Sequence, residues 1–523
     1  MTARIIITTL LLSLVSAASA QSHHDIKVGY QAQLDRRIAL TANSPIRSTT
    51  PLGTMTPQQR RQAVDAVWGA GPPTAEKLRI FDKFWSYVDA KFAAFQNIDI
   101  DWRAMRDRYR PEIAAGVSHG RFTGIMNHIA IELREGHTHA HDIPINWESI
   151  PLPGVPVFGV GDWTYNPSGA CSTAQPDGSA LVYSAMQGHP LGLRPGDRVL
   201  GYDGRPWREI YQELLAEELP LWPLFWGSSP SAFQHTMESS ATINWHLFQT
   251  MDVRKRTGET VHVPTSLMTG ARWWGFCSEQ LSVPGIPKPV DPWEDGVRHG
   301  VITGTDVGYI YVWGWGPTSS DEFADAIYDL TQVRHVEGLI VDFRFNSGGI
   351  MTASHSGISN LFDHPVPTTG FDERLRTSDH FAMKNLISPS TFILDFRSDT
   401  RQRGFFSYDG PIALLLGPGA VSSGDFASLW MTYHPRVRTF GKPTSSAFNL
   451  PTQPALGTEL DLGPDWFARV AEGNMYRVGS PNAYLTHTDI NIDEPVWLTP
   501  EDVTLGRDTV VAAARQWIDT QTP

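Results

Sequence analysis

The 523-residue sequence has only two cysteines, no run of Lys and Arg, and a single long apolar stretch. Cys171 and Cys277 allow at most one intramolecular disulfide, and the sequence leaves open whether they pair or stay as free thiols. The formal net charge is −13. Because no basic helix or patch accompanies this acidic balance, the sequence argues against nucleic-acid binding and against docking on anionic membranes.

The long apolar stretch lies at the start of the chain and has the pattern of a signal peptide covering residues 1–20. Arg4 precedes the apolar run Ile5–Val15, and small residues at 18–20 form a cleavage site before Gln21. No later stretch is long and apolar enough to span a bilayer. We therefore expect an exported, soluble protein, either periplasmic in a bacterium or secreted.

Composition and periodicity divide the rest of the chain into four parts. Hydrophobic residues make up 41% and charged residues 19%, which is typical of a globular protein, and the length predicts several domains. We expect a flexible lead-in over 21–55 and a helical domain over 56–143. A β-rich region rich in Pro, Gly and Trp follows over 144–295, and strands alternate with helices over 296–523, which predicts an α/β layered domain.

A serine stands at a predicted strand-to-helix junction in this last domain. Ile412–Leu416 is a short apolar run typical of a buried strand, residues 417–419 are Gly-Pro-Gly, and a helical pattern begins after Ser422 and Ser423. Such a turn exposes the serine hydroxyl and presents the next backbone N–H at a helix N-terminus, which suits a nucleophile and one oxyanion donor. The alternative is that either serine only caps the helix.

Three histidines follow the helical domain at alternate positions. Gly136 ends the helix, and His137, His139 and His141 would share one face of the strand that comes next. A zinc site with the adjacent Asp142 is an alternative use of this face. The sequence has no second cluster with ligand spacing, so we expect no metal.

The segment Val341-Asp342-Phe343-Arg344-Phe345-Asn346-Ser347-Gly348-Gly349 resembles the signature of the S41 serine peptidases, the family of C-terminal processing proteases and the tricorn protease. Three other blocks resemble that family in the same order. They are Glu-Leu-Arg-Glu-Gly-His-Thr at 132–138, the Pro-Gly-Asp and Asp-Gly turns at 195–204, and Ser-Ser-Gly-Asp at 422–425 followed by the Gly-Lys-Pro-Thr turn at 441–444. The resemblance implies a PDZ-like middle region and a ClpP/crotonase-like catalytic core.

The resemblance also implies site residues. Ser422 would be the nucleophile, and the N–H groups of Ser423 and Gly348 would form the oxyanion hole. Processing proteases use a lysine base about 25 residues after the serine, where this chain has Ala447 and Phe448, and Lys442 lies in the turn block instead. The tricorn-like branch uses a histidine of the helical head, and His137 occupies the matching position.

Two details depart from the tricorn pattern. Gly136 stands where that pattern has a serine, and the acidic partner of His137 has no clear motif, with Glu494 and Asp489 as candidates. We expect His139 and His141 to be solvated neighbours of the site.

The sequence thus predicts an exported serine endopeptidase that acts on peptides or proteins through an acyl-enzyme, without metal or organic cofactor. The first alternative is a non-catalytic protein that binds peptides or other ligands on the same fold. The second is metal-dependent hydrolysis through the histidine face. The oligomeric state is open.

Overall fold

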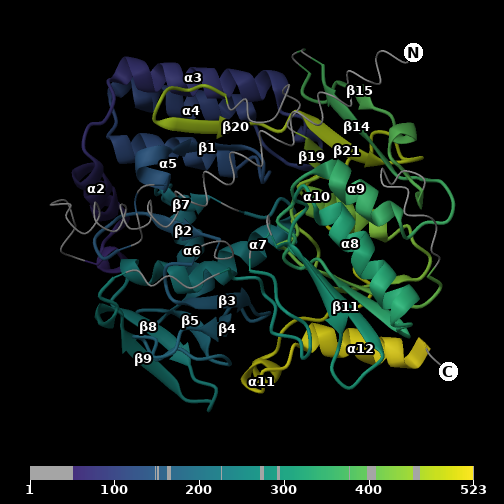
Figure 1. Ribbon diagram of the computed structural model, residues 1–523. Coiled ribbons are helices and arrows are strands. Elements are labelled where there is room, and N and C mark those ends of the chain that lie inside the picture. Colours follow the sequence, from purple (N-terminus) through teal and green to yellow (C-terminus); the bar gives the residue numbers. More distant parts are fainter. Residues whose placement is uncertain are drawn as a thin grey trace.

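The computed structural model describes residues 51–147, 149, 152–161, 166–224, 226–270, 276–290, 292, 295–375, 377, 379–396, 408–450 and 460–521. The expected signal peptide and nearly all of the expected lead-in lie outside these residues. Within the described ranges, no helix is long and apolar enough to cross a membrane. The fold combines helices and sheets in several compact layers (Figure 1).

Four helices form the N-terminal part: α2 (Pro57–Trp68), α3 (Thr74–Lys91), α4 (Trp102–Ala115) and α5 (His119–Ile131). The side chains of Thr56, Asp101 and Ser118 accept backbone N–H groups at the starts of α2, α4 and α5, and these caps fix where the helices begin. The helices bury a shared apolar core whose members on α3 recur at helical spacing: Ile80, Phe81, Phe84, Trp85 and Val88.

The short strand β1 (His139–Asp142) follows α5 and does not pair with its sequence neighbours. It pairs antiparallel with β20 (Trp466–Arg469), a strand from the C-terminal third of the chain. Trp466 and Ala468 pack into the same core as the helices. The segment that carries the histidines is therefore held between the N-terminal helices and a distant part of the sequence (Figure 1).

A six-stranded sheet forms the middle region. Its strands are β3 (Ala170–Ala174), β4 (Ala180–Ala185), β5 (Arg198–Tyr202), β6 (Arg205–Pro206), β8 (Thr250–Arg254) and β9 (Thr260–Pro264). Helices α6 (Trp207–Ala216) and α7 (Pro230–Ser239) pack beside it, and β2 (Phe158–Val160) pairs with β7 (Leu221–Leu224). Asp203 and Gly204 both have positive φ between β5 and β6, which confirms the predicted Asp-Gly turn.

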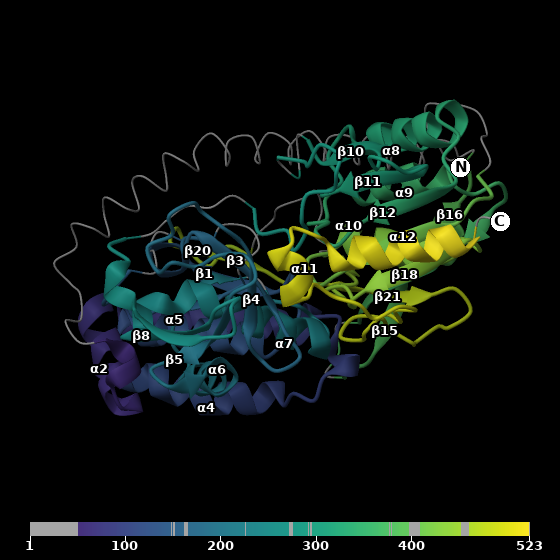
Figure 2. The same cartoon turned by 90° about the horizontal axis from the view of Figure 1, so that it is seen from below.

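A five-stranded sheet organises the C-terminal part. Its order is β10 (Val297–Val301), β11 (Val307–Val312), β12 (Gly338–Asp342), β17 (Ile412–Leu416) and β18 (Val437–Gly441), with all pairs parallel except β10–β11. Helices α8 (Ser319–Tyr328), α9 (Met351–Ser359) and α10 (Ser423–Met431) cover one face, and α12 (Thr509–Gln521) covers the other (Figure 2). Because both faces are covered, β12 and β17 are buried throughout.

Smaller elements complete this part of the molecule. A four-stranded sheet has the order β15 (Met383–Ile387), β14 (Thr369–Arg374), β21 (Gly473–Arg477) and β19 (Asn449–Leu450). Strand β13 (Val366–Pro367) pairs with β16 (Ile393–Leu394), and the short helix α11 (Pro500–Thr504) precedes α12. Gly506 adopts a positive φ between these two helices and separates them.

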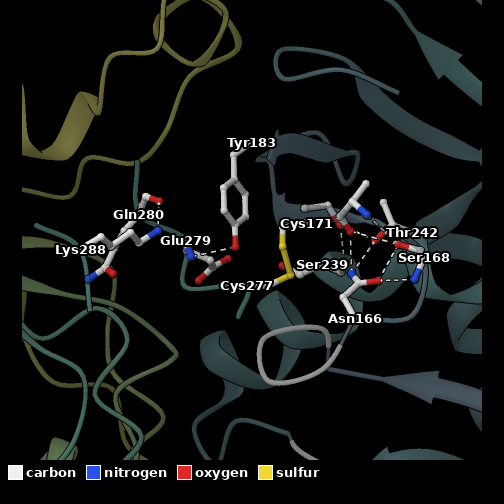
Figure 3. The surroundings of a disulfide bond; sticks show 12 residues. Asn166, Ser168, Cys171, Tyr183, Ser239, Thr242, Cys277, Glu279, Gln280 and Lys288 are labelled. Carbon is white, nitrogen blue, oxygen red and sulfur yellow. Dashed lines mark hydrogen bonds between the residues drawn. A yellow bond between two sulfur atoms is a disulfide. The ribbon is translucent and has the colours of Figure 1, made fainter. Parts of the chain in front are cut away.

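A disulfide joins the middle region to the segment that leads into the five-stranded sheet. Cys171 on β3 and Cys277 are bonded, with 5.3 Å between their Cα atoms and a sequence separation of 106. Figure 3 shows the bond beside Tyr183 and Glu279. The question that the sequence left open, whether the two cysteines pair, is answered by this bond.

Candidate active site

Ser422 occupies a strained turn between β17 and α10. Its φ is 60° and its ψ is −121°, a combination that is costly for any residue with a β-carbon, at about 1–3 kcal/mol. The side chain is half-buried, whereas the next nine residues, Ser423–Met431, are all buried. A serine held in such a conformation between a strand and a helix has the geometry of a nucleophile elbow.

The loop after β12 packs directly against this turn. Because β12 and β17 are parallel neighbours, their carboxyl ends meet, and the N–H of Val421 donates to the carbonyl of Asn346 over 2.9 Å. Gly348 has a φ of 87°, and a β-carbon placed on it would lie 2.9 Å from Cβ of Ser422. It would also lie 3.4 Å from the N atom of Ser423. Only glycine allows this approach.

Gly348 and Ser423 therefore lie beside Ser422, as the two predicted oxyanion donors would have to. Ser423 is the first residue of α10, where backbone N–H groups have no partner inside the helix. The N–H of Gly348 donates to Oδ1 of Asn346 over 3.2 Å. This contact is long, so a substrate oxygen would compete with a weak acceptor at that position.

Asp425 ties the serine turn to a second loop. It is fully buried, and its carboxylate accepts N–H groups from Ser422 at 2.8 Å, Ser446 at 2.7 Å and Ala447 at 3.0 Å. Burial raises the pKa of Asp425 to about 7, against the opposing effect of these backbone donors. One carboxylate thus positions both the nucleophile turn and residues 446–447.

His137 is held by an acidic neighbour that lies only two residues before it in the chain. Nδ1 of His137 lies 3.1 Å from Oε1 of Glu135, and the N–H of His137 donates to Oε2 over 2.9 Å. Thr138 donates its hydroxyl to the same Oε2 over 2.9 Å. Burial opposes the charge on Glu135, but the interactions with His137 and Thr138 keep the pKa of Glu135 below its ordinary value. An ionised carboxylate at Nδ1 leaves Nε2 of the imidazole to act as a base.

Contacts between loops bring the histidine segment to the serine turn. A β-carbon placed on Gly136 would lie 3.7 Å from Cβ of Ala447, the residue whose N–H reaches Asp425. The N–H of Gly136 donates to Oγ of Ser228 over 2.9 Å, and the N–H of Ser228 donates to the carbonyl of Ser445 over 2.7 Å. Gly136 and Val421, which precede His137 and Ser422, line one pocket.

Two family models match parts of this chain. The sequence model described as "Peptidase family S41" matches residues 306–477, and the one described as "Tricorn protease C1 domain" matches residues 73–150. Residues 306–477 are therefore an S41 peptidase domain. With this domain the chain is a serine peptidase, and peptides or proteins are its substrates. No curated protein matches the S41 chain.

Solved structures show the same fold at low sequence identity. Mature CPAF in complex with lactacystin superposes with a TM-score of 0.57 at 14% identity, covering 86% of this S41 chain and 97% of CPAF. A second structure of mature CPAF has a TM-score of 0.55 at 14% identity, covering 85% of this chain and 96% of that one.

The acidic partner that the sequence analysis sought is not at either suggested position. Glu494 pairs with Arg438, and Asp489 accepts the hydroxyl of Ser231 over 2.6 Å. The carboxylate that contacts Nδ1 of His137 is that of Glu135. The block Glu-Gly-His that carries the family resemblance contains it, so the residue was visible in the sequence, but no motif marked its role.

His139 and His141 are not solvated, so that expectation was wrong. Their exposed fractions are 9% and 3%, because β20 lies alongside β1 and Phe467 stacks on the ring of His139. Burial lowers the pKa of His141 to about 3, and that of His139 lies well below its ordinary value for the same reason. No group of metal-binding side chains was found in the described part of the chain.

Lys442 contacts the middle region of the S41 chain. Its Nζ lies 3.0 Å from Nδ1 of His235 and donates to the carbonyl of Ala174 over 3.2 Å. His235 in turn lies 2.6 Å from Oε1 of Glu279 through Nε2. Burial lowers the pKa of Lys442 to about 8. These contacts give Lys442 a structural role between two regions.

The Asp and Arg of the signature segment also hold the fold together. Arg344 is fully buried and donates to Oδ2 of Asp342 over 2.7 Å and to both carboxylate oxygens of Asp508 over 3.0 Å. Asp508 lies just before α12, so this pairing attaches the last helix to the end of β12. The loop with Gly348 therefore starts from a fixed point.

Proposed function

We propose that this S41 peptidase is an exported endopeptidase that forms an acyl-enzyme on Ser422, with His137 as general base and Glu135 as the residue that orients His137. The observation that carries the proposal is the strained conformation of Ser422, held against Gly348 and fixed by Asp425. Strain of this kind persists only where surrounding contacts enforce it, and it clusters at functional sites.

In the proposed reaction, Oγ of Ser422 attacks the carbonyl carbon of the scissile bond while Nε2 of His137 takes the hydroxyl proton. The same nitrogen then gives that proton to the leaving amine. In the second half of the reaction, His137 removes a proton from a water molecule as the water attacks the ester, and then returns it to Oγ of Ser422. Glu135 is charged and buried next to Nδ1, so it stabilises the imidazolium formed in each step.

The N–H groups of Ser423 and Gly348 are the proposed oxyanion donors. They flank Ser422, and the side chain of Asn346 contacts the N–H of Gly348 until a substrate oxygen replaces it. Fixed donors at this point favour the charge that develops on the carbonyl oxygen, an effect commonly worth about 10²–10³ in rate per donor.

The proposal also includes the division into domains and the location of the protein outside the cytoplasm. We propose a helical head at 56–143, a PDZ-like region at 144–295 and a ClpP/crotonase-like catalytic domain at 296–523. Two features support export, namely the N-terminal apolar pattern and the Cys171–Cys277 disulfide, since disulfides persist in oxidising compartments. Periplasmic or secreted forms are both compatible with these features.

Labelling with a fluorophosphonate tests the mechanism. The purified wild type, Ser422→Ala and His137→Ala would be treated and then analysed by intact mass and peptide mapping. We expect one adduct on Ser422, none in Ser422→Ala, and labelling at least 100-fold slower in His137→Ala. A folded wild type that takes no label would refute the acyl-enzyme mechanism and favour a ligand-binding protein, and an adduct on Ser423 would move the nucleophile by one residue.

A further inference from the structure

Two buried polar side chains, Trp226 and Ser278, line a pocket next to the turn that carries the proposed nucleophile. The pocket is lined by Gly136, Gly419 and Val421, which adjoin the loops of the site, and by residues 277–279 and the end of α7. Trp226 and Ser278 line this pocket, and neither Nε1 of Trp226 nor Oγ of Ser278 has a hydrogen-bond partner among the described residues. The exposed fractions of Trp226 and Ser278 are only 5% and 1%.

Unpaired buried donors are uncommon, because each one costs about 1–3 kcal/mol relative to a paired group. An indole N–H can only donate, and a serine hydroxyl can donate or accept. Together they suit a hydroxyl group of the substrate, whose oxygen accepts a hydrogen bond from the indole and which forms a second hydrogen bond with the serine hydroxyl. The pocket is also small, with a cavity volume of about 30 Å³, on the scale of a single water molecule.

The far wall is rigid, so Ser278 has a fixed position. Cys277 is bonded to Cys171 on β3, and on the other side the N–H of Glu279 donates to the hydroxyl of Tyr183 over 2.9 Å, as Figure 3 shows. The carboxylate of Glu279 accepts a hydrogen bond from Thr173 over 2.5 Å. A group fixed in this way needs no reorganisation when a guest enters.

The charged groups around the pocket already have partners. Glu279 is paired with His235, which contacts Lys442, and Arg344 is paired with Asp342 and Asp508. A charged guest would therefore enter a buried space without a free counter-charge, and this desolvation is costly. A branched apolar guest would leave both donors unpaired and would exceed the cavity.

We propose that this pocket receives the substrate side chain on the acyl side of the scissile bond and selects a small, uncharged, hydroxyl-bearing residue, above all serine. The inference rests on the proposed function, since the pocket gains this role from its place beside Ser422 and His137. Trp226 donates to the guest hydroxyl oxygen, and that hydroxyl donates to Oγ of Ser278.

Digestion of a peptide library by the wild-type protein, with cleavage sites read by mass spectrometry, tests the selectivity. We expect serine to be enriched before the cleaved bond, and kcat/KM for a matched serine peptide to exceed that for its alanine analogue about tenfold. The difference stays moderate because a water molecule can occupy the pocket beside alanine. Leucine and aspartate peptides should be cleaved more slowly than the alanine peptide.

Two variants connect the selectivity with the pocket. Ser278→Ala removes only the hydroxyl, whereas Trp226→Phe removes the indole N–H together with one ring, and we expect either to lower kcat/KM for the serine peptide to the alanine level. Activity on the alanine peptide, which makes neither hydrogen bond, should fall less than activity on the serine peptide. Trp517→Phe is the matched control, since Trp517 lies on α12 and packs on Phe440, and it should keep the wild-type preference.

The outcomes separate the two proposals. Preference for bulky apolar or charged residues, or an unchanged serine preference in both pocket variants, would overturn the pocket assignment while fluorophosphonate labelling of Ser422 remains. Absence of both cleavage and labelling in the folded wild type would overturn the proposed function and this inference with it.

Discussion

The contact between Glu135 and His137 gives the sharpest test of the site. Replacing Glu135 with glutamine keeps the size of the side chain and one acceptor oxygen but removes its charge. Glu135 is fully buried, and its two carboxylate oxygens hold Nδ1 of His137, the N–H of His137 and the hydroxyl of Thr138. Glutamine can satisfy at most part of this set, because its amide group donates where the carboxylate accepts.

The magnitude follows from the bond that is weakened most. A buried hydrogen bond to a charged group contributes about 1.5–3 kcal/mol. If the Nδ1 contact is made chiefly to the imidazolium of the transition state, its loss appears in kcat. We therefore expect kcat to fall about 10- to 100-fold in Glu135→Gln, at roughly 1.4 kcal/mol for each factor of ten, with KM changed less than twofold.

The assay compares kcat and KM on a cleaved peptide, together with the rate of fluorophosphonate labelling, for the wild type, Glu135→Gln and Glu132→Gln. Glu132 directly follows the last residue of α5, and its Oε1 lies 3.9 Å from Nε2 of His128, so Glu132 is a nearby acidic control outside the site. Thermal unfolding shows whether each variant is folded. A folded Glu135→Gln variant with kcat within threefold of the wild type would show that Glu135 does not assist His137.

Three further predictions concern the packing at the site and the stability of the fold. A β-carbon in Gly348→Ala would lie 2.9 Å from Cβ of Ser422 at a φ of 87°, so labelling should slow at least tenfold, and an unchanged rate would contradict the close packing. Asp508→Ala leaves the buried Arg344 with Asp342 as its one carboxylate partner. The free energy of unfolding, measured by urea denaturation, should therefore fall by about 3–5 kcal/mol, and a fall of less than about 1 kcal/mol would argue against a stabilising role of this ion pair. Burial lowers the pKa of His246 to about 4, whereas the unfolded value is about 6.5. As the pH falls through this window, only the unfolded chain takes up the proton, so His246 should remove up to about 3 kcal/mol of stability by pH 4. Denaturation at pH 7 and pH 4.5 should show a smaller loss in His246→Gln, and equal losses would contradict it.

The strands and helices around the site could be predicted because their apolar spacing is local. Ile412–Leu416 forms β17 with the predicted bounds, and the helical pattern expected next to Ser422 and Ser423 is α10. The turn with Ser422 could be predicted for the same reason, since a short apolar strand, a Gly-Pro-Gly segment and a helical pattern follow one another directly.

The surroundings of the histidines depend on contacts between distant segments, which single-sequence patterns do not reveal. His139 and His141 are buried because β20 pairs with β1 across more than 300 residues of sequence. Glu135 was missed for the opposite reason. It lies so close to His137 that only the local loop conformation, and no spacing rule, shows the two side chains turning toward each other.

The Cys171–Cys277 disulfide has a consequence for how the chain tolerates cutting. It closes a covalent ring with a sequence separation of 106, and this ring contains most of the six-stranded sheet and α7. Where other peptidases nick the chain, one cut inside the ring opens it without releasing a piece. Such a nicked chain would run as one species on a non-reducing gel and as two after reduction. The wall of the pocket, attached at Cys277, would stay joined to the catalytic domain.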